Sequence, residues 1–357
     1  MQDLDKLRQG IDKIDEQILH LLNERMGIVK TIGELKDKTQ SLIYRPERER
    51  AIIKRLEKLN CGLLTPKAIE AIYQEIFAVS RNLEKPQSVA YLGPEGSYSH
   101  QAAMSRFGSC SSYRALASIE DVFKEVANKE VNYGIVPIEN NTAGAVGETL
   151  DCLSKYDKLK IYAELYMDIH HSFVSLNKDL KAIKRIFSHP QGYPQCRSFL
   201  ESHHLNELEF IASKSTSNAA FLASKDEFSA AICSKIAAKL YNVPIFFETI
   251  EDNAANRTRF VILSQSKFPK TSSCKSSILA HTAHKVGSLS DLLNDFKNAN
   301  INLTRLESRP AKTKAFGYDF YIDFEGHIDD ENVQKILAKH KDIMWLGSYL
   351  SGENNEI

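Results

Sequence analysis

The chain has no excess of charge of either sign, because its 46 lysines and arginines equal its 46 aspartates and glutamates. A balanced chain has no overall field that attracts nucleic acid or an anionic membrane surface. The sequence also has no run of 18 apolar residues, so we expect no membrane-spanning helix. Its amphipathic, acidic N-terminus is unlike a signal peptide. These absences predict a cytoplasmic protein that binds neither nucleic acid nor membrane.

The six cysteines lie far apart in the sequence, at positions 61, 110, 152, 196, 233 and 274. None of them has the paired spacing of a zinc site or a redox motif, so we expect reduced and mostly buried thiols. The sequence also has no glycine-rich dinucleotide fingerprint, no phosphate-binding Lys-Ser/Thr loop and no metal-ligand spacing. We therefore expect a reaction that needs neither a cofactor nor a metal.

The length of 357 residues predicts two to three domains, and the first of them, residues 1–86, has a helical pattern. Apolar residues at steps of three and four predict one long helix that packs against other helices. Pro46 suits the first turn of a second helix ending near Asn60, and Thr65-Pro66 predicts the start of a third. The apolar seam of the first helix comprises Leu4, Leu7, Ile11, Ile14, Ile18, Leu21, Ile28, Ile32 and Leu35.

Arg25 occupies one position of this apolar seam, where a charge is costly unless it is paired. It is either a polar residue that sets the helix register or part of a binding site. Lys36 lies about 16 Å further along roughly the same face of the helix. Ser80 and Glu84 share a face of the third helix.

Arg48 and Glu49 open the second helix, so the three helices direct cations, a hydroxyl and carboxylates toward one interior. Arg8 lies about 25 Å and roughly 100° from Arg25. It is too far away to touch the same small ligand, and it would have to serve the site of a second chain.

Residues 87–265 alternate between predicted strands and helices, which favours an α/β fold with open sheets. Ligands of such sheets bind at the carboxyl ends of strands, where helix N-termini offer unpaired N–H groups. Residues 139–144 lie at such an end, and His189 occupies an equivalent place in the second half, where we expect it to orient other groups. The polar turn at residues 213–218 is either a carboxylate-binding turn or an ordinary helix cap.

Thr258, Arg259 and Phe260 begin an apolar, β-branched run that indicates a buried strand. They place a hydroxyl, a cation and an aromatic ring at one end of the strand, which suits a small anion containing a six-membered ring. Together with the motifs at residues 91–98, 136–141 and 188–191, this stretch closely resembles the prephenate dehydratase domain. Its implied fold is two α/β lobes around a cleft, as in periplasmic binding proteins.

The regions on either side resemble the usual partners of this domain. Residues 1–86 resemble the all-helical chorismate mutase domain, and the resemblance to the dehydratase domain covers residues 87–265. Residues 264–277 are rich in serine and lysine and predict a linker. Residues 275–357 predict the order βαββαβ and resemble the ACT domain.

The resemblance to chorismate mutases implies an intertwined dimer, so we expect a homo-oligomer of at least two chains. It implies that Arg25 of one chain and Arg8 of the partner subunit together bind the carboxylates of chorismate, while Arg48 helps to hold the substrate. Glu49 would take the substrate hydroxyl, and Lys36 would donate to the ether oxygen. Holding the folded conformer and stabilising negative charge on the breaking ether accelerate such a rearrangement.

Glu84 stands where many relatives carry glutamine, with Ser80 one turn before it. Only a protonated carboxyl can donate a hydrogen bond to the ether oxygen, so we expect mutase activity to decline as rising pH ionises Glu84. The alternative is that Glu84 is a solvated helix-end residue paired with Lys85 or Arg81.

The resemblance to prephenate dehydratases implies that prephenate loses CO2 and its ring hydroxyl to give phenylpyruvate. Aromatisation drives this reaction, so the protein need only assist the departing hydroxyl and bind two carboxylates. Thr258 would lie near the leaving oxygen and relay or position a proton, and Arg259 would anchor a carboxylate. The implied site residues are Glu139, Asn140, Ser188, Gln195, Thr216, Thr258, Arg259 and Phe260.

The C-terminal region contains two motifs of phenylalanine-sensing ACT domains. Residues 307–310 are their typical tetrapeptide, and residues 287–290 correspond to their Gly-Ala-Leu-Val motif with two positions changed. Gly287 would let an amino acid approach a helix N-terminus closely. The alternative is a purely structural dimerisation module. The implied L-phenylalanine-binding residues are Gly287, Ser288, Leu289, Glu307, Ser308, Arg309 and Pro310.

These resemblances together imply a bifunctional cytoplasmic enzyme of phenylalanine biosynthesis, inhibited by L-phenylalanine. One rival is a catalytically silent amino-acid-binding regulator with the same fold. Another is an arogenate dehydratase, which the fused mutase disfavours because the mutase product is prephenate.

Overall fold

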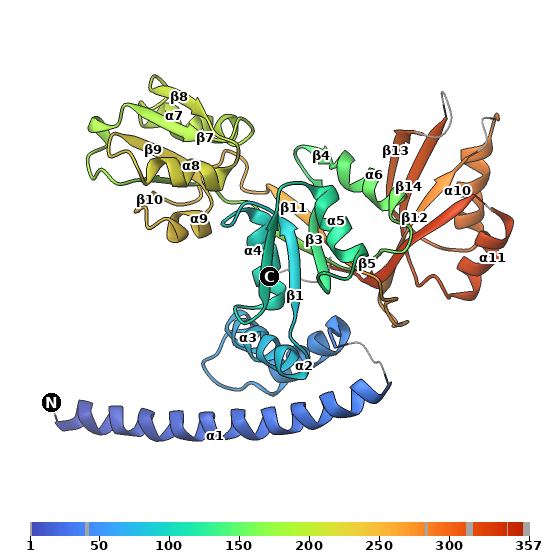
Figure 1. Cartoon of the computed structure of the whole chain (residues 1–357), viewed down its shortest axis with the longest axis horizontal. Helices are drawn as coiled ribbons and strands as arrows, with labels where there is room; N and C mark the ends of the chain where they lie inside the picture. The colour runs from blue at the N-terminus through green and yellow to red at the C-terminus, as the bar shows by residue number, and fades with distance from the viewer. Residues whose placement is uncertain (1, 40–42, 283–284, 312–316, 341, 353–357) are drawn as a thin grey trace. The chain divides into compact units, whose positions relative to one another are not determined.

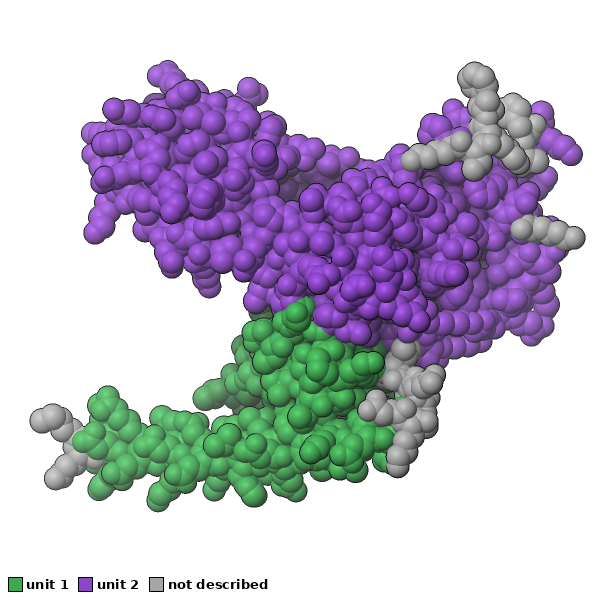
Figure 2. Space-filling view, viewed as in Figure 1, with its two compact units in different colours: residues 1–87, 106–112 green, residues 88–105, 113–357 purple. Residues whose placement is uncertain are grey.

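A computed structural model of the chain describes all residues except 1, 40–42, 283–284, 312–316, 341 and 353–357. The chain forms two compact units (Figures 1 and 2). The helical unit contains residues 1–87 and 106–112, and the α/β unit contains residues 88–105 and 113–357. No helix in the described part of the chain is both long and apolar enough to cross a membrane.

The helical unit has the three predicted helices, α1 (Gln2–Thr39), α2 (Pro46–Leu59) and α3 (Pro66–Glu84). Pro46 lies in the first turn of α2, and the Thr65 side chain caps α3 by accepting a hydrogen bond from the Ala68 N–H at 3.2 Å. Figure 1 shows α1 running well beyond α2 and α3. Most of its apolar seam is therefore exposed, including Leu7 (68%) and Leu21 (61%).

Residues 106–112 complete the helical unit, although they lie between two parts of the α/β unit in the sequence. Gly108 has a positive φ of +70° and lies so close to α3 that an added Cβ would be 2.3 Å from the Ala78 Cβ. The next residue, Ser109, donates from its N–H and hydroxyl to the Glu75 carboxylate at 3.1 and 2.9 Å. Phe107 is fully buried. We call residues 106–112 the inserted segment.

The α/β unit begins with a lobe built on a mixed sheet of strand order β2-β1-β3-β11-β5, with β4 paired to β3. β11 is antiparallel to both of its neighbours, β3 and β5. The elements are β1 (Ser88–Leu92), α4 (Tyr98–Phe107), β2 (Ser112–Leu116), α5 (Ile119–Ala127), β3 (Tyr133–Asn140), β4 (Gly144–Ala145), α6 (Gly147–Lys155), β5 (Lys160–Asp168) and β11 (Arg257–Ser264).

A second lobe carries a sheet of order β10-β6-β9-β7-β8. A 3-10 turn at Tyr193–Cys196, with Pro194 in it, precedes the short helix α7. The elements are β6 (Ser172–Ser175), β7 (Arg185–Ser188), α7 (Arg197–Ser202), β8 (Glu209–Ala212), α8 (Thr216–Ala223), β9 (Ser229–Cys233), α9 (Lys235–Leu240) and β10 (Ile245–Phe247).

The C-terminal domain has the predicted order βαββαβ, with strands arranged as β13-β14-β12-β15. The predicted linker is shorter than expected, because β12 begins at Cys274 and Phe268 is buried against Tyr162. The elements are β12 (Cys274–His281), α10 (Ser288–Asn298), β13 (Leu303–Pro310), β14 (Tyr318–Glu325), α11 (Glu331–Lys339) and β15 (Ile343–Leu350).

The C-terminal domain and the first lobe share one hydrophobic core. Leu279 and Leu346 of the domain pack with Val261 and Leu263 of β11. Gly347 of β15 lies against β5 so closely that an added Cβ would be 2.3 Å from the Ile161 carbonyl oxygen. The C-terminal domain and the first lobe are thus joined through this shared core as well as by the connecting segment.

Candidate active sites

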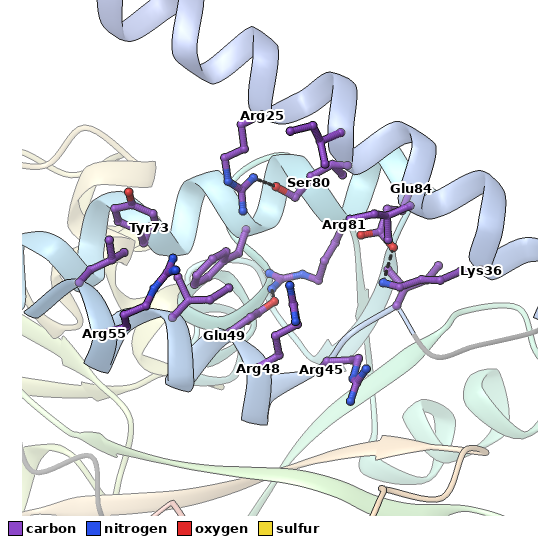
Figure 3. Close-up of a pocket in the computed structure, with 17 residues that line it drawn as sticks. Arg25, Lys36, Arg45, Arg48, Glu49, Arg55, Tyr73, Ser80, Arg81 and Glu84 are labelled. Carbon is purple, nitrogen blue, oxygen red and sulfur yellow. Dashed lines mark hydrogen bonds and ion pairs between the residues drawn. The ribbon is translucent and has the colours of Figure 1, made fainter. Parts of the chain in front are cut away.

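The helical unit contains a cavity of about 640 Å³ between its three helices (Figure 3). Six of the residues predicted from the sequence line it: Arg25, Lys36, Arg48, Glu49, Ser80 and Glu84. Three further polar residues line the cavity without any signal from the sequence pattern: Arg55, Tyr73 and Arg81. Arg45, which lies just before α2, lines it as well.

Two contacts across the cavity connect α1 to α3. Arg25 Nη1 donates to Ser80 Oγ at 2.5 Å, and Lys36 Nζ donates to Glu84 Oε2 at 2.7 Å (Figure 3). Glu84 therefore points into the cavity and is paired with Lys36, not with Lys85 or Arg81 as the solvated alternative required. This placement is the one on which the expected pH dependence rests.

The cavity is strongly cationic. Its lining contains six cations (Arg25, Lys36, Arg45, Arg48, Arg55 and Arg81) and two carboxylates (Glu49 and Glu84). Burial lowers the pKa of Arg25, with nearby Arg48 acting in the same direction. Burial raises the pKa of Glu49, against the opposing effect of Arg81. Such a cavity suits a small dianion that also offers a hydroxyl group to a carboxylate.

Arg8 does not line this cavity. Its side chain is 67% exposed and lies 3.5 Å from Asp5 on the same helix. The sequence placed it too far from Arg25 for one ligand, and the structure keeps the two apart.

The α/β unit contains a larger cavity of about 1010 Å³ between its two lobes, which we call the cleft. Five predicted residues line it: Asn140, Gln195, Thr216, Thr258 and Phe260. His189 and the turn at Lys214 and Ser215 line it too. Ser215 also caps α8 by accepting from the Asn218 N–H at 3.0 Å, so the turn is both a cap and a part of the cleft wall.

Thr258 is oriented by Asn140, which lies opposite it on β3. Asn140 Nδ2 donates to Thr258 Oγ1 at 2.9 Å, while Asn140 Oδ1 accepts from the N–H groups of Thr142 and Ala143 at 3.0 and 2.9 Å. These bonds assign the amide orientation of Asn140. Since the Thr258 oxygen already accepts a hydrogen bond, its own proton is free to be donated to a group in the cleft.

Neutral polar side chains continue from Asn140 across the cleft. Asn140 Nδ2 also donates to Asn256 Oδ1 at 2.8 Å, and Asn256 Nδ2 donates to Gln195 Oε1 at 3.1 Å. His171 Nε2 lies 3.1 Å from the same oxygen, and its Nδ1 lies 3.0 Å from Tyr98 Oη. Burial lowers the pKa of His171, which favours its neutral form. Tyr98 lies within the motif at residues 91–98 and Asn256 lies two residues before Thr258, whereas no sequence signal indicated His171.

Arg259 does not line the cleft, contrary to its predicted role as an anchor. Neighbouring residues of a strand point to opposite faces, so Thr258 faces the cleft while Arg259 faces the C-terminal domain. Arg259 donates to Glu164 at 2.7 Å, Asp323 at 2.6 Å and the Tyr349 hydroxyl at 2.9 Å. Its side chain is 3% exposed.

The partners of Arg259 are themselves buried acids. Burial alone would lower the pKa of Arg259, but the carboxylates of Asp323 and Glu164 raise it well above its ordinary value. Glu139, paired with Arg259 in the β3–β11 register, faces the same way and forms an ion pair with Arg305 at 2.9 Å. Ser188 is also away from the cleft lining, fully buried with its hydroxyl donating to the His189 carbonyl at 3.2 Å.

The two predicted effector motifs do not line one cavity in the described residues of the C-terminal domain. Gly287 precedes α10 with φ +85°, and Ser288 lines a cavity of about 270 Å³ beside Asp291 and His340. Residues 307–310 are in β13 and do not line this cavity. Arg309 instead approaches Asp151 of the first lobe at 3.4 Å.

The chain matches three protein families in succession: chorismate mutase type II over residues 7–85, prephenate dehydratase over residues 89–268 and the ACT domain over residues 276–342. It is 40% identical over 357 residues to a bifunctional chorismate mutase/prephenate dehydratase of Aquifex aeolicus, with 98% of each chain covered. An equally named protein of Pseudomonas aeruginosa is 38% identical over 342 residues, 94% of this chain and 93% of that one.

A crystal structure of a prephenate dehydratase from Arthrobacter aurescens in complex with L-Phe is also similar. It aligns with a TM-score of 0.69 at 28% identity, over 75% of this chain and 91% of that chain. The family matches, the relatives and the two cavities agree with one another. This chain belongs to the bifunctional chorismate mutase/prephenate dehydratase family and carries an ACT domain.

Proposed function

We propose that the chain converts chorismate to prephenate in the helical unit and prephenate to phenylpyruvate in the cleft. The observation that carries the proposal is that one chain has two cavities of different chemistry, each within the part that matches the corresponding family. A time course with chorismate as the only substrate should show prephenate and then phenylpyruvate. A folded protein that forms neither product would instead favour the silent regulator.

In the mutase cavity, catalysis is positioning and charge stabilisation. Arg25 and Arg48 bind the carboxylates of chorismate, and Glu49 accepts a hydrogen bond from its hydroxyl group. Lys36 and a protonated Glu84 lie where they can donate to the ether oxygen as its bond to carbon breaks. Charge that develops on that oxygen is stabilised by donors already in place.

In the cleft, Thr258 donates its proton in a hydrogen bond to the departing ring hydroxyl of prephenate. The carboxylate on the ring leaves as CO2, its electron pair completes the aromatic ring, and the hydroxyl leaves as water after it takes a proton. Lys214 and the polar turn before α8 bind a carboxylate, Gln195 and Thr216 contact the substrate, and Phe260 lies against its ring. Arg259, Glu139 and Ser188 support this arrangement from behind the cleft.

A second copy of the chain completes the mutase site. The exposed apolar seam of α1 supports this proposal, since an unpaired apolar face of this length needs a partner. The partner subunit's Arg8 would then reach the cavity that Arg25 occupies in this chain. Mixing an Arg8→Ala variant with an Arg25→Ala variant should restore part of the mutase activity that each lacks alone. No restoration would contradict a shared site.

L-Phenylalanine inhibits the dehydratase by binding to the ACT domain. The support is the pair of motifs at residues 287–290 and 307–310, together with the bridge from Arg259 in the catalytic strand to Asp323 and Tyr349 of the domain. Substitution of Gly287 by valine strains a residue with φ +85° and should weaken inhibition without changing uninhibited turnover. Unchanged inhibition would place the effector elsewhere.

We expect the enzyme to be cytoplasmic.

A further inference from the structure

Arg81 of α3 is a buried cation in the mutase cavity to which the family resemblance assigns no role. It is 2% exposed, and its guanidinium lies between two partners. Nη1 donates to Glu49 Oε1, and Nη2 donates to the carbonyl of Arg106 in the inserted segment at 2.7 Å. Figure 3 shows Arg81 reaching toward Glu49 at the centre of the cavity.

The inserted segment also supplies part of the packing around Arg81. The guanidinium carbon lies 5.7 Å from the centre of the Phe107 ring and 5.2 Å from that of Tyr44, which is itself buried against Phe107 at 5.1 Å. Two aromatic faces and a carbonyl therefore fix the guanidinium plane. The Nε atom is also buried, and its N–H has no partner among the described residues. An unmet buried donor costs stability, so packing alone does not explain the residue.

We propose that Arg81 is a positioning residue of the mutase site, which holds the Glu49 carboxylate in its ionised form and turned toward the cavity. We further propose that residues 106–112, which lie in the dehydratase part of the sequence, complete this site by holding Arg81. The inference rests on the proposed mutase function. If the proposal holds, the mutase reaction depends on residues that lie in the dehydratase part of the sequence.

The charge balance around Glu49 gives the proposal its physical basis. Burial favours the protonated form of this carboxyl, and Arg81 and then Arg106 oppose it. Arg81, which the inserted segment holds, and Arg106, which belongs to that segment, are thus the two residues that favour the ionised carboxylate. The charged groups that face Glu49 from all packed elements are Arg25 and Lys36 of α1, Arg45, Glu47, Arg48 and Arg55 at α2, Arg81 and Glu84 of α3, and Arg106 of the segment.

The decisive experiment is the pH profile of mutase kcat/KM in the full chain, for wild type, Arg81→Met, Arg81→Lys and Lys85→Met. Ionised Glu49 is present above its pKa, so loss of Arg81 raises that pKa and moves the acid limb of the profile to higher pH. A shift of one pH unit is about a tenfold loss of activity on that limb. Arg81→Lys should restore most of the position of the limb. Lys85→Met, which removes an exposed cation from the end of α3, should leave it unchanged.

An unshifted acid limb in folded Arg81→Met would overturn the proposal, and so would a uniform loss of rate at every pH. Helical content measured by circular dichroism serves as the folding control for the helical unit of each variant, and dehydratase activity on added prephenate as the control for the α/β unit. If Arg81→Met does not fold, a variant of the inserted segment provides the test instead. Gly108→Ala moves the segment off α3 and should shift the same limb, whereas Gly62→Ala, where the nearest atom is 3.7 Å from the added Cβ, should not.

A readout without substrate separates this inference from the proposed function. The Glu49 carboxyl carbon can be followed by NMR in protein labelled at glutamate, with Glu49→Gln used for assignment. Its titration should move to higher pH in Arg81→Met and in Gly108→Ala. If the wild-type chain had no mutase activity, the proposed function would fail, while this titration would still support or refute the role of Arg81.

Discussion

The two cavities of this protein use opposite electrostatics. The mutase cavity has six cations and two carboxylates in its lining, whereas Lys214 is the sole lysine or arginine among the described residues that line the cleft. The first reaction develops charge on an ether oxygen within a dianion, and preorganised cations stabilise that charge. The second is driven by aromatisation, for which we propose that oriented neutral donors such as Thr258 are enough. On this proposal, each cavity has the charge that its own reaction needs.

The strongest test of the comparison removes the one hydroxyl on which the neutral site depends. Thr258→Ala should lower dehydratase kcat by roughly 10²-fold or more, because positioned proton donation typically contributes that much. Mutase activity of the same preparation should remain, since Thr258 belongs to the other unit. Thr258→Val, which keeps the shape of the side chain, should behave likewise. Equal loss of both activities in folded protein would disprove the two-site assignment.

The next effect concerns the cation that is adjacent to Thr258 but excluded from the cleft. Arg259→Met removes the closest cation from the buried acids Glu164 and Asp323, with Lys275 remaining 3.6 Å from Glu164, and should cost about 3–5 kcal/mol of unfolding free energy. Urea unfolding of the α/β unit measures this cost. If Arg259 instead anchored the substrate, stability would change little and KM for prephenate would rise sharply.

Lys214 provides the matching test inside the cleft. Lys214→Met should raise KM for prephenate about tenfold, the loss expected from one charge-assisted hydrogen bond, with a smaller change in kcat. Lys225→Met, on the same lobe but outside the cleft lining, serves as the control. An unchanged KM would mean that the carboxylate is held by neutral groups alone, which would sharpen the contrast between the two cavities.

The smallest effect concerns the side chain at position 84. This position is tested by whether it offers a hydrogen-bond donor beside Lys36: Glu84→Gln keeps a donor there and Glu84→Ala removes it. Mutase kcat/KM, measured across about pH 5 to 8.5, around the usual range for carboxyl titration and above it, should be retained at every pH in Glu84→Gln and lowered in Glu84→Ala, while dehydratase activity follows neither change. Equal loss in both variants would contradict this role.

Residue spacing predicted the elements better than it predicted which residues meet. The steps of three and four placed Arg25 and Lys36 on one face of α1, and both do line one cavity. The same reasoning treated Thr258 and Arg259 as neighbours in one site, although the two-residue period of a strand separates them. The sequence does not show that the domain after β11 covers the face of this strand on which Arg259 lies. It also does not show that this domain supplies Asp323 as the ion-pair partner of Arg259.

Arg81 and His171 show a second limit of predicting site residues from the sequence. The sequence named Arg81 only as a possible partner of Glu84, because nothing in residues 1–86 indicates that Phe107 and the Arg106 carbonyl pack against it. His171 follows β5 in a stretch without a recognisable motif, and it joins the cleft through Gln195 and Tyr98, both distant in sequence. Long-range contacts of this sort arise from the fold as a whole.

The close approach of Gly347 to Ile161 has a consequence for protein engineering. Replacing the ACT domain with a sensor for another amino acid is attractive, and the short stretch after Ser264 looks like the natural place to cut. Any graft must nevertheless reproduce a strand with glycine at position 347, because a side chain there would collide with the Ile161 backbone. It must also bring an acid to the place of Asp323 to meet Arg259. Chimaeras designed only around the connecting segment should therefore express poorly, and those that keep both features are the better starting point.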